Sequence, residues 1–318
     1  MSLEQANTRA RAAVDRFRDR AGFEGGIGYP RENASEQRDV YALDVHVDEA
    51  GRLASYLGAV YGGPEARARD DPEVVERLHE RADRFHTRAR ESITSVTELR
   101  DEELDSVSPA ILSPDWQMLG TMQRELVSDW GTLQSDVYVG SYVYNDDDEA
   151  KTHHFGTLTS HTNSPGVNEY SDNNYHQKSG SMRHGYGSGF PVDLGGYAPS
   201  SNETGNYSYG GSIGTGIGGP TLGVQLSYSP TDVSRFDESD EISDRAAWDW
   251  KYNPKLLWDG ATGKPDTFEP SSVGYSYTAP EQGDLIVTVD RSADWFDPRS
   301  GSASPTVSST TSLRYDTA

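Results

Sequence analysis

Histidine and aspartate side chains gather in the middle of the chain, and their types suit a metal centre. Five of the eight histidines lie within 32 residues, and they are His153, His154, His161, His176 and His184. Imidazole and carboxylate groups are common ligands of zinc and other divalent cations. The spacing matches no H-E-x-x-H motif, and strand neighbours such as His153 and His154 point to opposite faces. The candidate metal ligands are Asp146, Asp148, His154 and His161.

These residues leave several interpretations open. They allow a metal-dependent hydrolase that uses the His153–His184 region, or a structural cation held by carboxylate oxygens. They are also typical of polar loop residues that are solvated or stack with tyrosine. The chain has no cysteine, which excludes thiolate nucleophiles and Cys-ligated metals, and it has no G-x-S-x-G motif. We therefore expect no enzyme activity, no catalytic residues and no cofactor other than such a cation.

Tyrosines among Gly, Ser and Asn suggest a binding surface. These tyrosines are Tyr170, Tyr175, Tyr186, Tyr197, Tyr207 and Tyr209. This composition is typical of adaptable binding loops, where a rigid amphipathic ring supplies contact area. It fits a contact with other protein subunits, a cell-surface glycan or an S-layer. The alternative is that the rings cover the β core, and the sequence does not decide between the two.

The first helical segment is a second candidate for partner binding. It carries several arginines, including Arg9 and Arg16, in a chain that is otherwise acidic. An arm of this kind can dock on an acidic partner subunit. Ion pairs within a solvated helix face are the alternative.

Several segments have the 3.6-residue spacing of helices. Asp71-Pro72-Glu73 supplies an N-cap, a proline at the first helical position and an early acid. Apolar residues then recur every three or four positions to about residue 96. Ser113-Pro114-Asp115 repeats this start signal. The sequence therefore predicts helices over 4–21, 48–61, 72–96 and 113–130.

The second half of the chain has the alternation of strands. Period-2 patterns predict strands over 135–144, 151–161, 222–229, 272–278 and 284–290. The fold class that follows is α+β, with a helical N-terminal domain and a Gly/Tyr-rich antiparallel β-sandwich or barrel-like domain. We place the helical assembly domain at 1–130, the β domain at 131–299 and a Ser/Thr-rich tail at 300–318. That tail has the composition of a segment that is disordered in isolation.

The net charge of the chain indicates the salt concentration around the protein more than the nature of its partners. The 318 residues include 28 Lys+Arg and 51 Asp+Glu, for a net charge of −23, and only five of the basic residues are Lys. In concentrated salt such charge is screened and costs little stability, so the composition predicts a halophilic origin. A nucleic-acid partner is not expected without a basic face. We also expect no transmembrane helix and no secretory signal.

One stretch resembles a known family. The run from Leu222 to Val233, the acidic Asp237–Asp240 and the motif Trp248-Asp249-Trp250 resemble a strand pattern of the leukocidin-like β-pore-forming proteins. Similar runs occur in uncharacterised proteins of salt-loving archaea. The resemblance implies an antiparallel β-sandwich around 205–290, and it implies no individual functional residue.

These observations favour a non-enzymatic assembly protein of a halophilic archaeon or its virus. The expected role is a virion structural component, such as a capsid, turret, spike or tail part, located in the virion or the cytoplasm. Its partners would be other copies of itself and other subunits, and membrane binding is not expected. The alternatives are a leukocidin-like pore-forming or membrane-surface-binding protein, and the metal-dependent hydrolase described above.

Overall fold

The structure of the chain is a computed structural model that describes residues 1–21, 26–33, 38–48, 51–62, 66–94, 107–108, 116–144, 152–153, 160–163, 175–187, 192–198, 207–214, 221–228, 233–237, 239, 244–252, 267–268, 270–276, 280–297 and 302–316. Its helices are α1 (Leu3–Ala21), α2 (Arg67–Asp70) and α3 (Pro72–Thr94). Its strands are β1 (Gly26–Ile27), β2 (Arg31–Asn33), β3 (Arg38–Val47), β4 (Leu53–Tyr61), β5 (Val107–Ser108), β6 (Trp116–Val127), β7 (Thr132–Tyr144), β8 (Thr152–His153), β9 (Ser160–Asn163), β10 (His176–Tyr186), β11 (Asp193–Ala198), β12 (Tyr207–Gly214), β13 (Thr221–Tyr228), β14 (Val233–Asp237), β15 (Arg245–Tyr252), β16 (Thr267–Phe268), β17 (Ser271–Tyr275), β18 (Leu285–Phe296) and β19 (Val307–Asp316).

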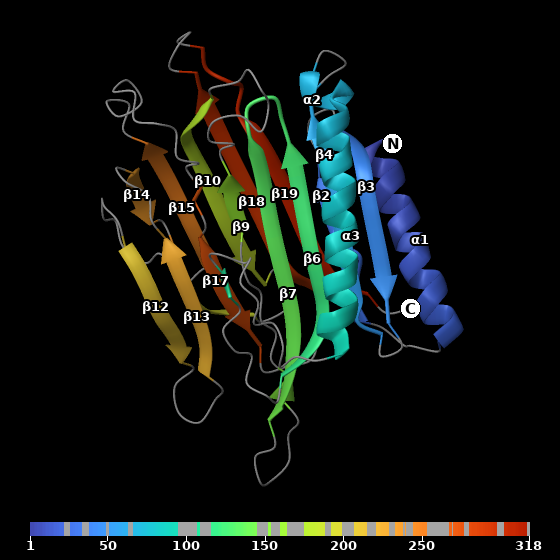
Figure 1. Ribbon diagram of the computed structural model, residues 1–318. Helices are drawn as coiled ribbons and strands as arrows, with labels where there is room; N and C mark the ends of the chain where they lie inside the picture. Colours follow the sequence, from blue (N-terminus) through green and yellow to red (C-terminus); the bar gives the residue numbers. More distant parts are fainter. Residues whose placement is uncertain are drawn as a thin grey trace.

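Two large sheets make up most of the described structure (Figure 1). The front sheet has the strand order β16-β9-β7-β6-β4-β3, with β8 beside β7. The back sheet has the order β1-β19-β18-β10-β15-β14, with β2 beside β19. Two smaller sheets, β11-β17 and β12-β13-β5, lie outside these orders. The described part of the chain is therefore mostly β, with few helices, and the α+β class and the sandwich-like arrangement agree with it.

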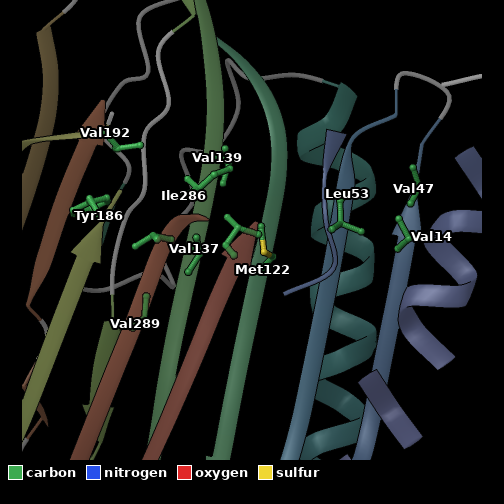
Figure 2. Packing of buried hydrophobic residues seen from close by; sticks show 12 residues of the cluster. Val14, Val47, Leu53, Met122, Val137, Val139, Tyr186, Val192, Ile286 and Val289 are labelled. Carbon is green, nitrogen blue, oxygen red and sulfur yellow. The ribbon is translucent and has the colours of Figure 1, made fainter. Parts of the chain in front are cut away.

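The hydrophobic core fills the space between the two large sheets. One cluster joins Val137 and Val139 of β7 to Ile286 and Val289 of β18, and Figure 2 shows these side chains between the two layers. A second cluster contains Leu126 and Leu133 of the front sheet and Ala293, Trp295 and Val307 of the back sheet. Apolar side chains from both sheets are thus removed from water together, which is what holds a sandwich closed.

The helices pack against the outside of the two large sheets. α3 lies on the outer face of the front sheet (Figure 1), where Val74 and Leu78 pack with Tyr56 and Val60 of β4. β4, α3 and β6 form a crossover unit, because β4 and β6 pair in parallel. α1 contacts β3 of the front sheet and β2 of the back sheet, so it covers one edge of the sandwich.

Several predicted elements are confirmed. The helix predicted over 72–96 is α3, and the Asp71 carboxylate accepts a hydrogen bond from the backbone N–H of Glu73 at 2.9 Å. The helix predicted over 4–21 is α1. The strands β7, β13, β17 and β18 lie where the alternation predicts them. The return strand predicted over 151–161 corresponds to the short strands β8 and β9, which both pair with β7.

Two predicted helices are wrong, for the same physical reason. The segments 48–61 and 113–130 contain the strands β4 and β6. β4 is buried on both faces over Leu53–Val60, because α3 covers one face and the back sheet the other. A strand buried on both faces has no polar–apolar alternation to detect. In β6, a bulge between Met118 and Gly120 also shifts the alternation.

The Ser/Thr-rich tail predicted at 300–318 contains a strand in the folded chain. Residues Val307–Asp316 form β19, which pairs with β18 and with β2 and β1. Its Val307, Ser309, Thr311 and Leu313 are buried. In the folded chain this Ser/Thr-rich segment is a strand with a polar outer face, and its disorder in isolation stays a prediction. The boundary predicted at residue 130 falls in the connection between β6 and β7, which pair along their whole length.

Candidate functional site

The strands β12 and β13 lie in an unusual stretch of the sequence. From Thr204 to Thr231, 28 consecutive residues carry no charged side chain, although a quarter of the whole chain is charged. Within this stretch β12 and β13 pair antiparallel over eight positions each. We call Tyr207–Gly214 and Thr221–Tyr228 the uncharged hairpin.

The register sorts the hairpin residues into two chemically different faces. Residues at alternate positions of a strand share a face, and directly opposed residues share it as well. The pairs Tyr207–Tyr228, Tyr209–Leu226, Gly211–Val224 and Ile213–Leu222 fall on one face. The pairs Ser208–Ser227, Gly210–Gln225, Ser212–Gly223 and Gly214–Thr221 fall on the other. One face is thus apolar and aromatic, and the other is small and polar.

Among the residues that the structure describes, the uncharged hairpin has few connections to other elements. It belongs to neither large sheet, and its pairing partner is β5, which meets β13 at Gln225 and Leu226. β12 also contacts β11. Figure 1 shows β12 and β13 on the side of the molecule away from α1. An amphipathic hairpin in this position can meet water with one face and an apolar medium with the other.

The tyrosines predicted to bind partners have different positions. Tyr186 is buried in the core at 6% exposure, and its hydroxyl lies 2.7 Å from Ser272 Oγ, so it is not on a binding surface of this chain. Tyr175 and Tyr197 are half-buried, and the Tyr197 ring meets the edge of Trp248 at 6.2 Å between centroids. For Tyr186 the ring is part of the core, whereas the binding role of Tyr175 and Tyr197 stays a prediction. Tyr170 lies outside the described residues, and Tyr207 and Tyr209 are placed in β12 by their backbone.

Arg9 and Arg16, the two arginines predicted to dock a partner, are exposed on α1. The Arg16 Nε donates to the carbonyl of Ala12 at 2.9 Å, and the Arg9 Nη1 approaches the Met1 sulfur at 3.4 Å. Both side chains thus lie along the helix surface, where a partner subunit has access to them. Their proposed docking role stays a prediction.

The histidine region does not assemble a metal site within the part of the chain that the structure describes. There, no group of three or more His, Asp or Glu side chains has an arrangement that suits an ion. Asp146, Asp148 and His154 lie outside the described residues, and His161 is placed only as a backbone position of β9. The hydrolase and the structural cation stay predictions.

His184 has a structural environment instead of a catalytic one. Its Nδ1 lies 2.6 Å from Ser272 Oγ, and its ring meets the edge of Trp248 at 5.2 Å. Burial, together with the positive charge of Arg291, lowers the pKa of His184 to about 3. The imidazole is therefore neutral over the physiological pH range and serves as a hydrogen-bonding core residue.

A buried ionic contact attaches α3 to the front sheet. Glu125 of β6 is 2% exposed, accepts a hydrogen bond from the Tyr56 hydroxyl at 2.9 Å, and forms an ion pair with Arg81 of α3. Burial raises the pKa of the Tyr56 phenol above its usual value, so the hydroxyl keeps its proton. This contact is structural, because it lies under the helix. Sequence reasoning missed it because Glu125 falls in a segment predicted to be helical.

The comparisons with known proteins add little to this geometry. No protein-family model and no curated protein sequence matches the chain. One similar solved structure is the Clostridium perfringens NetB toxin in its membrane-inserted form, at 8% sequence identity and a TM-score of 0.26. That similarity covers 61% of this chain and 94% of the toxin chain, and it is too weak to carry an argument. Among the described residues, no helix is long and apolar enough to cross a membrane.

Proposed function

We propose that this chain inserts the uncharged hairpin into a lipid bilayer and that several copies together form a pore. The observation that carries the proposal is the register of β12 and β13, which separates an apolar face from a small polar face over the whole hairpin. Strands that face lipid on one side and water on the other require this alternation. A charged residue at the lipid-facing midplane costs about 2–4 kcal/mol, and the hairpin has none.

The length of the hairpin comes close to what the same role requires. Each strand has eight residues, which span about 27 Å at about 3.4 Å per residue. A transmembrane strand is tilted by about 45° and needs about 9–11 residues to cross the hydrocarbon core, so each described strand covers most of that distance. The Tyr207–Tyr228 pair at the open end of the hairpin supplies aromatic side chains of the kind that prefer the membrane interface.

Assembly follows from the backbone chemistry of a hairpin in lipid. A two-stranded hairpin has two edges whose N–H and C=O groups find no water in the hydrocarbon core, and each unsatisfied group is costly. Neighbouring copies satisfy these groups when their hairpins pair edge to edge in a closed ring. The small polar faces then line a water-filled centre. The composition predicts self-association, and in this proposal insertion into the bilayer requires it.

Leakage of a dye from vesicles tests the proposal. We expect the purified protein to release a small fluorescent dye from vesicles of archaeal ether lipids or of phosphatidylcholine with phosphatidylglycerol, in low and in multimolar salt. Val224→Lys adds a charge to the apolar face, and about 2 kcal/mol per copy weakens insertion at least about 30-fold. No leakage at any protein-to-lipid ratio would refute the proposal.

A neighbouring residue supplies the matched control. Gln225 is on the polar face, opposite Gly210. Gln225→Lys adds the same charge where the proposal places water, so leakage persists and the conductance shifts toward anions. If Val224→Lys and Gln225→Lys lose leakage equally, the assignment of the two faces is wrong.

The virion role of a halophile stays a prediction from composition. It is favoured if the protein forms closed rings or lattices in multimolar salt while vesicles of both compositions stay intact. In that outcome the apolar face of the uncharged hairpin serves as a contact between subunits.

A further inference from the structure

The exposed surface of α1 carries a stripe of arginines. Arg9, Arg16 and Arg20 are exposed, and they are spaced seven and four residues apart, which is close to whole turns of a helix. They therefore share one face over about 16 Å, at about 1.5 Å per residue. The acidic residues of α1 lie about 60° or more around the helix axis from these arginines. We call Arg9, Arg16 and Arg20 the basic stripe.

The guanidinium groups of the basic stripe contact neutral atoms of their own helix. Arg16 Nε donates to the carbonyl of Ala12 at 2.9 Å, and Arg20 Nε donates to the carbonyl of Arg16 at 3.1 Å. Arg9 Nη1 approaches the Met1 sulfur at 3.4 Å. Among the described residues, no salt bridge includes any of these three arginines. Their positive charge is thus presented to solvent or to a partner.

The outer face of α3 carries the opposite charge. Its acidic residues are exposed and are spaced three, four and three positions apart, so they share one face over about 15 Å. The other side of the helix packs on β4 through Val74 and Leu78. Over the ranges that the structure describes, no salt bridge joins these carboxylates to a basic side chain. We call them the acidic stripe, which consists of Glu73, Glu76, Glu80 and Asp83.

The two stripes agree in length and have opposite charges, but they lie on separate helices. Both helices pack on β3, and Figure 1 shows this strand between them. Each stripe also places like charges one turn apart, as in Arg16 with Arg20 and Glu76 with Glu80. Like charges at this spacing destabilise a helix. A stripe of opposite charge from another molecule would offset the repulsion in both helices.

We propose that the basic stripe of one copy of this chain docks on the acidic stripe of another copy. The chain itself supplies a surface of the required charge and length. Complementary charges steer two surfaces together and fix their orientation. Each copy carries both stripes, so the contact can repeat between copies. This association takes place in solution and depends on no membrane, so it is independent of the pore proposed above.

Reversal of the charges tests this contact. Arg16→Glu with Arg20→Glu reverses the basic stripe, and Glu76→Arg with Glu80→Arg reverses the acidic stripe. Sedimentation velocity of the full chain measures association without lipid, at the lowest sodium chloride concentration that preserves the native circular dichroism spectrum. We expect the unmodified protein to associate and each double variant alone to associate at least about tenfold more weakly, because several exposed ion pairs become repulsive.

An equal mixture of the two double variants is the decisive sample. The reversed stripes are again complementary between the two variants, so association returns, and its return also shows that both variants fold. A mixture that associates no better than either variant overturns the proposal, and so does an unmodified protein that stays monomeric. If a double variant does not fold, the single reversals Arg16→Glu and Glu80→Arg replace the pairs.

Three controls separate this contact from other causes. Asp15→Arg changes the charge on another flank of α1, so association persists. Association of the unmodified protein weakens as sodium chloride is raised, because the Debye length falls to about 3 Å at 1 M; association that is independent of salt overturns the proposal. Cosedimentation with phosphatidylglycerol vesicles identifies a lipid partner. If only the vesicles, and no second copy, bind through Arg16 and Arg20, the proposal is overturned.

Discussion

Gly180 gives a sharp test of how the back sheet packs. It lies on β10, where an added methyl group would stand 2.2 Å from Trp250 Cζ2 and 2.7 Å from the carbonyl oxygen of Ser292. An ordinary contact begins at 3.4 Å, so Gly180→Ala forces the indole to retreat by about 1.2 Å. Trp250 is 2% exposed and packs with Met182 and Trp248, which leaves little room for that movement.

The expected cost follows from this geometry. Overpacking of a filled core destabilises a protein by about 1–3 kcal/mol, and the clash with the Ser292 backbone places Gly180→Ala near the upper limit. Gly185, on the same strand, has no atom within 4 Å of an added methyl group. Gly185→Ala is therefore neutral or stabilises by up to about 1 kcal/mol, because alanine restricts the unfolded chain.

Urea unfolding followed by tryptophan fluorescence measures both variants. We expect Gly180→Ala to lower the free energy of unfolding by about 3 kcal/mol relative to Gly185→Ala, with the m-value unchanged. Equal free energies for the two variants would refute the reasoning, since they would show that Trp250 does not lie against β10.

Two further substitutions probe the buried polar contacts. Tyr56→Phe removes the hydroxyl that donates to Glu125, and we expect a loss of about 2 kcal/mol because the acceptor is charged. Its control, Tyr41→Phe, removes a 2.9 Å bond to the neutral carbonyl of Arg69 and costs about 1 kcal/mol; a larger loss for Tyr41→Phe would contradict this. Folding lowers the pKa of His184 from 6.5 to about 3. The contribution of the neutral imidazole to stability is therefore complete above pH 6.5 and is lost as the pH falls toward 3. His184→Gln makes the free energy of unfolding less dependent on pH between 6.5 and 3. An unchanged pH profile would contradict this, because it would show that the pKa of His184 does not differ between the folded and the unfolded chain.

The elements that the sequence predicts correctly are those with one face in water. α3 carries its apolar stripe toward the front sheet and its charges outward, so its periodicity and its Asp71 cap are visible in the residue order. β18 alternates because its two faces meet different surroundings. In these segments the local pattern and the tertiary environment agree.

The elements that the sequence misplaces are those covered on both sides. β4 and β6 lie between α3 and the back sheet, and their apolar residues occur at spacings that also fit a helix. β19 differs from them, because only one of its faces is buried, and there Ser309 and Thr311 alternate with the rest of a Ser/Thr-rich segment that shows little apolar periodicity. No local pattern reports that a second layer will cover a strand.

The sequence by itself determined the charge, the absence of cysteine, the 28 uncharged residues from Thr204 to Thr231 and the positions of the two long helices. These are properties of composition and of nearest neighbours along the chain. Only the tertiary structure decided that two faces of the uncharged hairpin differ in polarity, since this depends on which residues of β12 oppose those of β13. It likewise decided that Arg38 and Arg291 donate to the same hydroxyl, that of Ser309, because those residues are far apart in sequence and only the packing of the two sheets brings them together.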